Sequence, residues 1–259
     1  SDIDSWDLQD LKDYHKTYYA PNNALVVIAG DVKFAEVKRL AEKYWEPIPA
    51  QAKPKKVRTV EPEQKGERRV YVQKASATSA NVMFAYHVPA SSHEDYYSLS
   101  LLSDILSLGD SSRLSRSLID DQQLATMVTT FYPDSFDPNL FYVYAVAADN
   151  VSAKQLEKAI IKALNLIMEQ GVSESELIKV KNNAQVAFYR TLSTINGKAD
   201  TLGTYALHTG DYKKMFTAVE DMSSVTIEDI QRVTKKYLRR ANRTVGVLNS
   251  HEDKQQGDQ

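Results

Sequence analysis

The order of apolar patterns constrains the fold of this chain most, because strand patterns come in adjacent pairs and a block of helix patterns follows them. Alternating apolar residues predict strands over 69–73 and 81–88. A second pair is predicted over 125–132 and 140–147, separated by a turn rich in Pro and Asp. A last strand is predicted over 244–248. The sequence therefore predicts an α/β (α+β) fold, a mainly antiparallel sheet with helices packed on one face.

Capping-box patterns mark where the later helices begin, since a Ser or Thr and an acidic or amide residue three positions on can cap each other's backbone. The pattern occurs at Ser152 with Gln155, Ser173 with Glu176, and Thr226 with Asp229. Apolar spacing predicts further helices over 94–108 and 197–208. Ser111 or Ser112 is expected to cap a short helix that ends near Asp120.

The first part of the chain has its own pattern of elements. Helices are predicted over 5–18 and 34–44. Between them, Ala24–Ala29 is a continuous apolar run that ends at Gly30, which predicts a buried strand. A stretch over 49–66 is dominated by Pro, Lys, Glu and Gln, which predicts a semi-extended linker.

Domain boundaries follow from this linker. We expect residues 1–48 to belong to a first domain and residues 67–250 to form a second one. Residues 251–259 read as a polar tail.

Composition excludes several classes of function. The 259-residue chain has no cysteine, so disulfides, thiolate nucleophiles and cysteine-ligated metal sites are excluded. A net charge of −2 gives no broad attraction to nucleic acid. No apolar run approaches the length of about 18 residues that a membrane span needs. We therefore expect no nucleic-acid partner and no membrane span. The acidic N-terminus has no signal-peptide pattern, so any targeting segment would lie upstream.

The histidines do not form a metallopeptidase motif, which needs two imidazoles one helical turn apart. The five are His15, His87, His93, His208 and His251, and no two are three or four positions apart. His87 and His93 read as surface residues. His15 reads as packed or hydrogen-bonded rather than as a ligand. His93–Asp95 reads as the first turn of a helix, where carboxylates are favourable, rather than as a cation site.

Two other patterns admit a functional and a structural interpretation. Gly109–Arg113 reads as a joint between helices rather than as an anion site, because a helix precedes it where an anion site needs a strand. Tyr142 and Tyr144, with Tyr132 on the neighbouring strand, either line a peptide-binding surface or pack as strand tyrosines ordinarily do. No serine-nucleophile elbow, phosphate loop or dinucleotide fingerprint occurs. We predict no catalytic, cofactor-binding or metal-binding residue in this chain.

Four stretches together resemble the insulinase/pitrilysin family of zinc metallopeptidases, which includes mitochondrial processing peptidase and many bacterial zinc proteases. They are Tyr18–Val32, Leu106–Leu114, Gly171–Lys181 and Val225–Leu238. Tyr18–Val32 is the most specific, since it looks like the helix–strand segment near the end of that family's first domain. The order and approximate spacing of the four stretches fit along nearly the whole chain.

The resemblance implies where the zinc is held. In that family an inverted HxxEH motif and a distant Glu bind it, in the first domain, upstream of the segment that residues 18–32 resemble. The ligands would therefore lie before residue 1. Residues 1–48 would be the C-terminal segment of the catalytic domain, and residues 67–250 would be a metal-free second domain. This chain would bind no cofactor, with zinc expected in the intact enzyme.

One local difference from the family narrows the implied role. Family halves that complete the active site from the opposite side carry an Arg and, seven residues later, a Tyr. In the matching stretch here, Ile119 and Thr126 stand at those positions. Neither offers the hydrogen bonds that a guanidinium and a phenol give to a scissile carbonyl. The resemblance thus implies the companion domain within a zinc-bearing half.

The resemblance implies a non-catalytic C-terminal region of a zinc-dependent metalloendopeptidase, forming part of its peptide-substrate chamber and inactive alone. The implied partners are peptide or protein substrates, the upstream catalytic domain, and a second family half or another copy of the chain. The alternative is a structural or partner-stabilising non-catalytic member of the family. An intact HxxEH upstream separates the two. Exported bacterial relatives suggest a periplasmic location.

Overall fold

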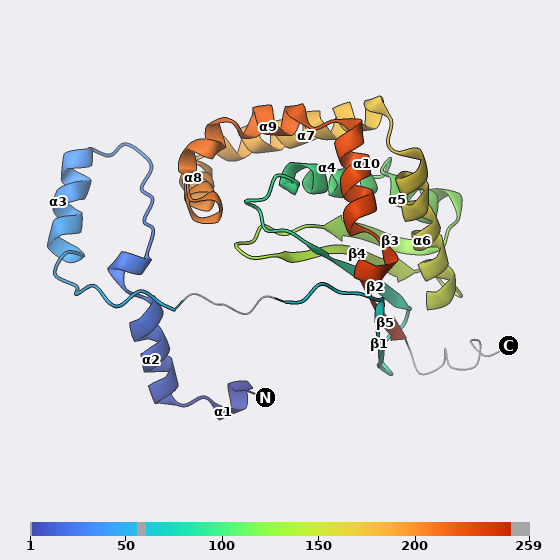
Figure 1. Cartoon of the computed structure of the whole chain (residues 1–259), viewed down its shortest axis with the longest axis horizontal. Coiled ribbons are helices and arrows are strands. Elements are labelled where there is room, and N and C mark those ends of the chain that lie inside the picture. Colours follow the sequence, from blue (N-terminus) through green and yellow to red (C-terminus); the bar gives the residue numbers. More distant parts are fainter. Residues whose placement is uncertain (1, 56–60, 250–259) are drawn as a thin grey trace.

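The computed structural model describes residues 2–55 and 61–249. Its main body is a five-stranded sheet in the order β1-β5-β2-β4-β3, with helices packed on one face (Figure 1). The strands are β1 (Arg68–Gln73), β2 (Asn81–Val88), β3 (Ala125–Phe131), β4 (Asn139–Ala147) and β5 (Arg243–Asn249). All neighbours pair antiparallel except β1 and β5, which are parallel. The predicted fold class is confirmed, and the parallel pair is an addition to it.

Three capping boxes begin helices where the sequence predicted them, after Ser152, Ser173 and Thr226. The α-helices are α1 (Asp2–Ser5), α2 (Leu8–Tyr18), α3 (Phe34–Tyr44), α4 (Tyr96–Ser107), α5 (Arg113–Ser115), α6 (Ala153–Gln170), α7 (Glu174–Leu192), α8 (Ile195–Thr209), α9 (Ala218–Ser224) and α10 (Ile227–Tyr237). Short 3-10 turns are η1 (Pro21–Asn23), η3 (Tyr212–Phe216) and η4 (Arg240–Asn242), and η2 (Arg116–Asp121) is a π-helix. No helix of the described residues has the length and apolar character that a membrane crossing requires.

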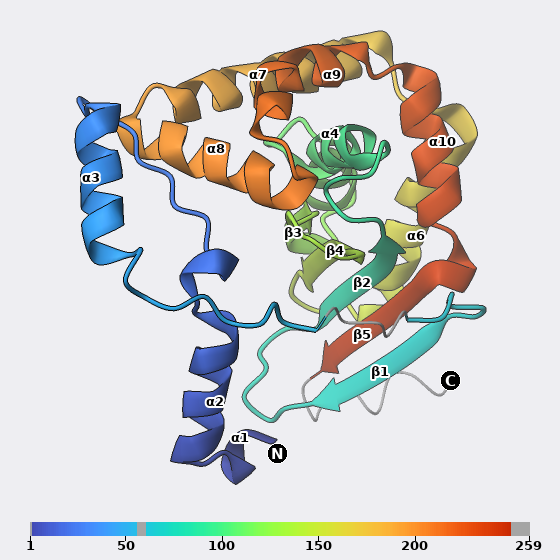
Figure 2. The same cartoon turned by 60° about the vertical axis from the view of Figure 1, so that its left-hand side comes forward.

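The core lies between the sheet and the helices α4, α6 and α10 (Figure 2). Every second residue of β2 and of β4 points into it, including Phe84 and Phe141, both fully buried. Leu102 of α4 and Ile160 of α6 are buried from the helix side. Each such side chain contributes about 1.5–3 kcal/mol when removed from water. The alternation that predicted the strands is therefore the pattern of the buried face.

The predicted strand at Ala24–Ala29 is wrong. The segment has no strand assignment, and Leu25, Val26 and Ile28 are 48%, 51% and 49% exposed. A β-strand needs a neighbouring strand for its backbone hydrogen bonds, and no strand among the described residues lies alongside this one. Its contact with the body is instead to α8, where the side chain of Val27 approaches Gly203.

The predicted linker is fixed to the body at its C-terminal end. Gln64 is buried, and its amide nitrogen donates to the carbonyl oxygens of Gly66 and Arg243 at 2.8 Å each. Glu67, directly after it, accepts from the Arg243 guanidinium at 2.8 Å. Gln64 therefore lies against β5, while residues 56–60 and the predicted tail 251–259 lie outside the described residues. The domain boundary itself stays a prediction.

We expect the substitution Asp104→Asn to raise the free energy of unfolding by about 1–2 kcal/mol at pH 7. Asp104 is half-buried on α4, none of the described residues donates a hydrogen bond to its carboxylate, and burial raises its pKa to about 6. Between about pH 4 and pH 6 the unfolded chain therefore releases a proton that the folded chain keeps, and the native protein loses stability. The asparagine variant lacks this loss.

Urea unfolding at pH 3.5 and pH 7 checks this expectation, because the two proteins should differ only at the higher pH. The control is Asp110→Asn, at an exposed carboxylate in the loop after α4. Equal stability of Asp104→Asn and the native chain at pH 7 would contradict the effect of burial.

Candidate functional site

The histidines that the sequence singled out are engaged in separate local contacts. His87 lies on β2 with its Nδ1 4.0 Å from a carboxylate oxygen of Glu61. His93 Nδ1 accepts a hydrogen bond from the backbone N–H of Asp95 at 3.0 Å. His15 stacks on Tyr19 with ring centroids 5.0 Å apart. Within residues 2–55 and 61–249, no three His, Cys, Asp or Glu side chains gather as metal ligands. The absence of a site from the whole chain stays a prediction.

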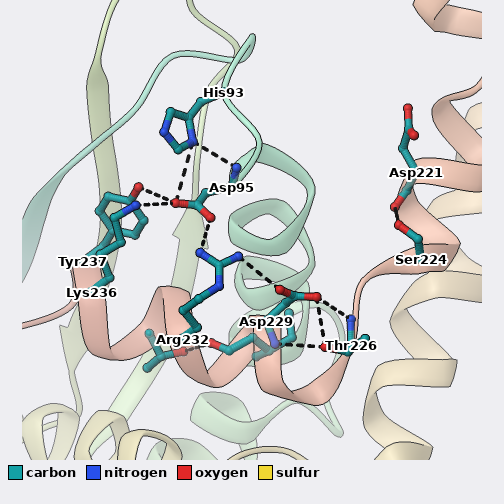
Figure 3. Close-up of polar contacts among 11 residues, drawn as sticks. His93, Asp95, Asp221, Ser224, Thr226, Asp229, Arg232, Lys236 and Tyr237 are labelled. Atoms are coloured by element: carbon teal, nitrogen blue, oxygen red, sulfur yellow. Dashed lines mark hydrogen bonds and ion pairs between the residues drawn. The ribbon is translucent and has the colours of Figure 1, made fainter.

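Asp95 is the buried centre of a charged cluster that joins α4 to α10 (Figure 3). Its carboxylate accepts hydrogen bonds from Lys236 Nζ at 2.8 Å and from the Tyr237 hydroxyl at 2.6 Å, and a further one from the Arg232 guanidinium. The side chain makes no capping bond to the α4 backbone. Asp95 occupies the N-cap position of α4, so it lies at the start of a helix as predicted, but three donors on α10 hold its carboxylate in place of the α4 backbone.

The electrostatics of this cluster point to a structural role. Burial alone raises the pKa of Asp95, but hydrogen bonds from Lys236, Tyr237 and Arg232 outweigh it and hold the pKa at about 2. A general acid or base works best with a pKa near the operating pH. Asp95 stays ionised at neutral pH and serves as a fixed anchor for α10.

The Gly109–Arg113 joint is a structural feature, as predicted. It connects α4 to α5, and the Arg113 guanidinium binds both carboxylate oxygens of Glu176, with Nε–Oε1 at 2.6 Å and a second nitrogen at 2.7 Å from Oε2. Arg113 lowers the pKa of Glu176 to about 2. Glu176 also closes the capping box of α7, so one carboxylate fixes the joint and the helix start together.

Ile119 and Thr126 lack the guanidinium and the phenol that an Arg and a Tyr would offer to a peptide carbonyl. Ile119 lies in the π-helix η2 and packs against the core. Thr126 is exposed on the edge strand β3, with its hydroxyl 3.5 Å from the Val146 carbonyl oxygen. π-helices often mark functional sites. The side chain that this one presents at position 119 is apolar and lacks any donor.

The face of the sheet turned away from the core carries a band of apolar and aromatic side chains, which we call the outer face. On β4, Tyr142 and Tyr144 alternate with the buried Phe141 and Val143 and therefore point outward. The strand registers place the same side of the sheet at Val70, Val72, Met83, His87, Met127, Phe131, Leu140, Tyr142, Tyr144, Val146 and Leu248. Phe131 stacks on Tyr142 with ring centroids 4.5 Å apart. The outer face is therefore the candidate contact surface of the sheet.

Tyr132 does not belong to the outer face, although the sequence grouped it with Tyr142 and Tyr144. It follows β3 and packs against the core. Its hydroxyl donates to the carbonyl oxygen of Pro89 at 2.5 Å, and its ring lies 5.6 Å from that of Tyr96. Because neighbouring residues along a strand point to opposite faces, Phe131 rather than Tyr132 lies on the outer face, where it pairs with Tyr142.

Sequence comparison identifies relatives along nearly the whole chain. Residues 5–184 match the peptidase M16 inactive domain. The chain is 30% identical over 252 residues to the zinc protease PqqE of Helicobacter pylori, covering 95% of this chain and 56% of that protein. It is 26% identical over 244 residues to the mitochondrial-processing peptidase subunit beta of Lentinula edodes, covering 88% and 51%. The chain thus spans about half the length of the curated relatives it matches.

Solved structures agree with this assignment. A protease from Helicobacter pylori has a TM-score of 0.89 at 29% identity, covering 96% of this chain and 60% of that chain. A peptidase M16 inactive domain from Pseudomonas fluorescens shares the fold, with a TM-score of 0.79 at 17% identity over 94% of this chain and 57% of that one. The resemblance to insulinase/pitrilysin zinc metallopeptidases is confirmed, and the chain belongs to the peptidase M16 family, in which it represents the inactive domain.

Proposed function

We propose that the outer face is part of the wall of a peptide-substrate chamber in a zinc-dependent metalloendopeptidase. The composition of this face carries the proposal, because its exposed and partly exposed positions hold Tyr, Phe and Met side chains, which are enriched at protein contacts. Such a surface gives an extended peptide broad apolar contact with little demand on its sequence. Relatives named as zinc proteases support the activity of the whole protein.

We expect the zinc ligands of that protein to lie in a domain that precedes this chain. The described residues of this chain offer no three-ligand cluster, so no chemical step is assigned to them. Their contribution is to bind the peptide and to hold it extended while the zinc-bearing domain acts.

We further propose that residues 1–48 complete the preceding domain, that 49–66 link it to the body at 67–250, and that 251–259 form a polar tail. The apolar side chains of the first segment support this division. Leu8 on α2 is 67% exposed and Phe34 on α3 is 82% exposed. Short amphipathic helices are stable mainly through packing of their apolar face, which these helices lack among the described residues.

The partners in this proposal are a peptide or protein substrate, the preceding domain, and a second M16 half or another copy of this chain. Relatives named as subunits, such as the mitochondrial-processing peptidase subunit beta and cytochrome b-c1 complex subunit 2, support assembly with a second half.

We expect the protein that contains this chain and its zinc-bearing domain to cleave an unstructured peptide, and a chelator to stop the cleavage. Replacing Tyr142 and Tyr144 together by serine should raise KM about tenfold with kcat little changed, since aromatic contacts of this kind contribute about 0.5–1.5 kcal/mol each. Steady-state kinetics with a fluorogenic peptide measure this.

The control for this experiment is Tyr189→Ser, at an exposed tyrosine on α7, away from the outer face. An unchanged KM in the double variant would show that the outer face does not bind the peptide. If the longer protein lacks HxxEH and cleaves no peptide, the result favours the alternative function, in which the protein is a structural or partner-stabilising member of the family.

A further inference from the structure

A cavity of about 620 Å³ lies within the helical layer, at the N-terminal end of α4. Its walls come from α4 and the loop before it, from the loop between β3 and β4, and from α8, η3, α9 and α10. No residue of the outer face contributes to it, so an inference about this cavity goes beyond the chamber function. A volume of this size is typical of pockets that bind small molecules or large side chains.

Tyrosine hydroxyls line the cavity. Those of Tyr97 on α4 and Tyr205 on α8 are 3.0 Å apart and share a hydrogen bond. The neighbouring Tyr96 donates to the carboxylate of Asp134 in the β3–β4 loop. The cavity therefore presents polar groups and aromatic rings together.

More carboxylates than lysine and arginine side chains line the cavity. Glu94, Asp134 and Asp221 form no ion pair within the part of the chain that the structure describes. Arg232 also lines the cavity, but its guanidinium is already bound to Asp95 and Asp229. One further lysine, at position 214, lines the wall.

Two carboxylates on separate elements, Asp134 and Asp221, both affect the pKa of the two tyrosines. Burial is the main cause that raises the pKa of Tyr97, and the charges of Asp221 on α9 and Asp134 in the loop raise it further. The same two carboxylates raise the pKa of Tyr205, again after burial as the main cause. Both carboxylates therefore act on the space beside the phenol pair.

A buried ring nitrogen on the same wall lacks a partner. Nδ1 of His208 on α8 is inaccessible to solvent and has no hydrogen bond to any described residue. The ring is packed edge-on against Phe136 of the β3–β4 loop, with centroids 4.4 Å apart. Buried polar atoms are nearly always hydrogen-bonded in folded proteins. This nitrogen can therefore still form a hydrogen bond with a group bound in the cavity.

We propose that this cavity binds a guanidinium or primary ammonium group on an aliphatic stem, as carried by an arginine or lysine side chain of a peptide or by a free polyamine. Asp134 and Asp221 supply charge-assisted hydrogen bonds to such a cation. The rings of Tyr97 and Tyr205 supply aromatic surface for the cation and its stem. The proposal does not depend on the chamber function.

Isothermal titration of the 259-residue chain tests the class of ligand. The probes are Nα-acetyl-L-arginine methylamide, spermidine, and Nα-acetyl-L-citrulline methylamide as the neutral counterpart of the first. We expect the arginine amide to bind at least about tenfold more tightly than the citrulline amide. Tighter binding of the arginine amide than of spermidine indicates a peptide as the source, and the reverse indicates a polyamine. Equal binding of arginine and citrulline, no binding of either cation, or binding of inorganic phosphate instead would overturn the proposal.

Variants locate the binding to this cavity. Asp221→Asn should weaken the arginine amide about tenfold, and Thr204→Lys, which puts an ammonium into the cavity wall, should abolish binding. Glu220→Gln makes the same charge change at the neighbouring exposed residue outside the wall and should leave binding unchanged. Circular dichroism verifies that each variant is folded. Native affinity in the folded Thr204→Lys chain contradicts the proposal, and so does native affinity in folded Asp221→Asn.

Discussion

Replacing Asp95 by alanine is expected to lower the free energy of unfolding by about 3 kcal/mol at pH 7. The carboxylate is fully buried and accepts hydrogen bonds from Arg232, Lys236 and Tyr237. The three donors lie on α10. Removing the carboxylate therefore also removes the hydrogen bonds that link α10 to the start of α4. The two cations are about half exposed and can regain water, which keeps the loss below that of a fully buried pair.

Asp95 also makes the free energy of unfolding depend on pH in the acid range. Its folded-state pKa of about 2 lies below the ordinary value of 3.8, so its stabilisation is fully present above about pH 4 and is lost as the pH falls through 2. Urea unfolding of Asp95→Ala should therefore show a smaller loss of stability over that interval than the native chain shows.

The matched control is Glu94→Ala, at the adjacent exposed carboxylate, for which we expect a change within about 0.5 kcal/mol. If Asp95→Ala were as stable as Glu94→Ala at pH 7, the cluster would not be holding α10 in place.

Replacing Gly197 by alanine is expected to cost about 3 kcal/mol, although the position is helical and alanine is the better helix former. The reason is the tight corner between α7 and α8. A Cβ atom at position 197 would lie 1.9 Å from the carbonyl oxygen of Thr191 and 2.9 Å from Oγ1 of Thr194. The Gly197 N–H donates to that same Oγ1 at 2.9 Å, so the clash also breaks the cap of α8.

Gly203→Ala is the control, because it makes the same substitution within the same helix. A Cβ there meets only the Val27 side chain, at an ordinary contact distance of 3.5 Å. This variant should gain up to about 1 kcal/mol from helix propensity. Thermal and urea unfolding of the two variants should therefore move in opposite directions, and equal shifts would show that the corner tolerates a Cβ.

The charged residues around Asp95 form an anchor between helices rather than a catalytic cluster. His93 Nδ1 lies 3.7 Å from the Asp95 carboxylate, and the Arg232 guanidinium binds it. In this inactive domain the Asp95 pKa of about 2 and its three donors support an anchor between helices. The functional surfaces we propose are instead the outer face and the cavity beside Tyr97 and Tyr205.

The sequence by itself determined the features that depend on neighbours within one or two turns of chain. The alternation in residues 81–88 predicted β2 and its buried face, since side chains alternate along any strand. The Ser152 and Ser173 capping boxes predicted the starts of α6 and α7, because each box closes within three residues. The four stretches that resemble zinc metallopeptidases predicted the M16 family.

Only the tertiary structure decided what depends on segments far apart in the chain. The last strand, β5, lies between the first two, β1 and β2, and pairs parallel with β1. Asp95 finds its donors on α10, more than a hundred residues later, rather than in its own helix. Ala24–Ala29 has the apolar run of a strand, but none of the strands among the described residues lies beside it. A local pattern states which side chains avoid water, whereas the identity of the segment that covers or pairs with them is fixed only when the chain has folded.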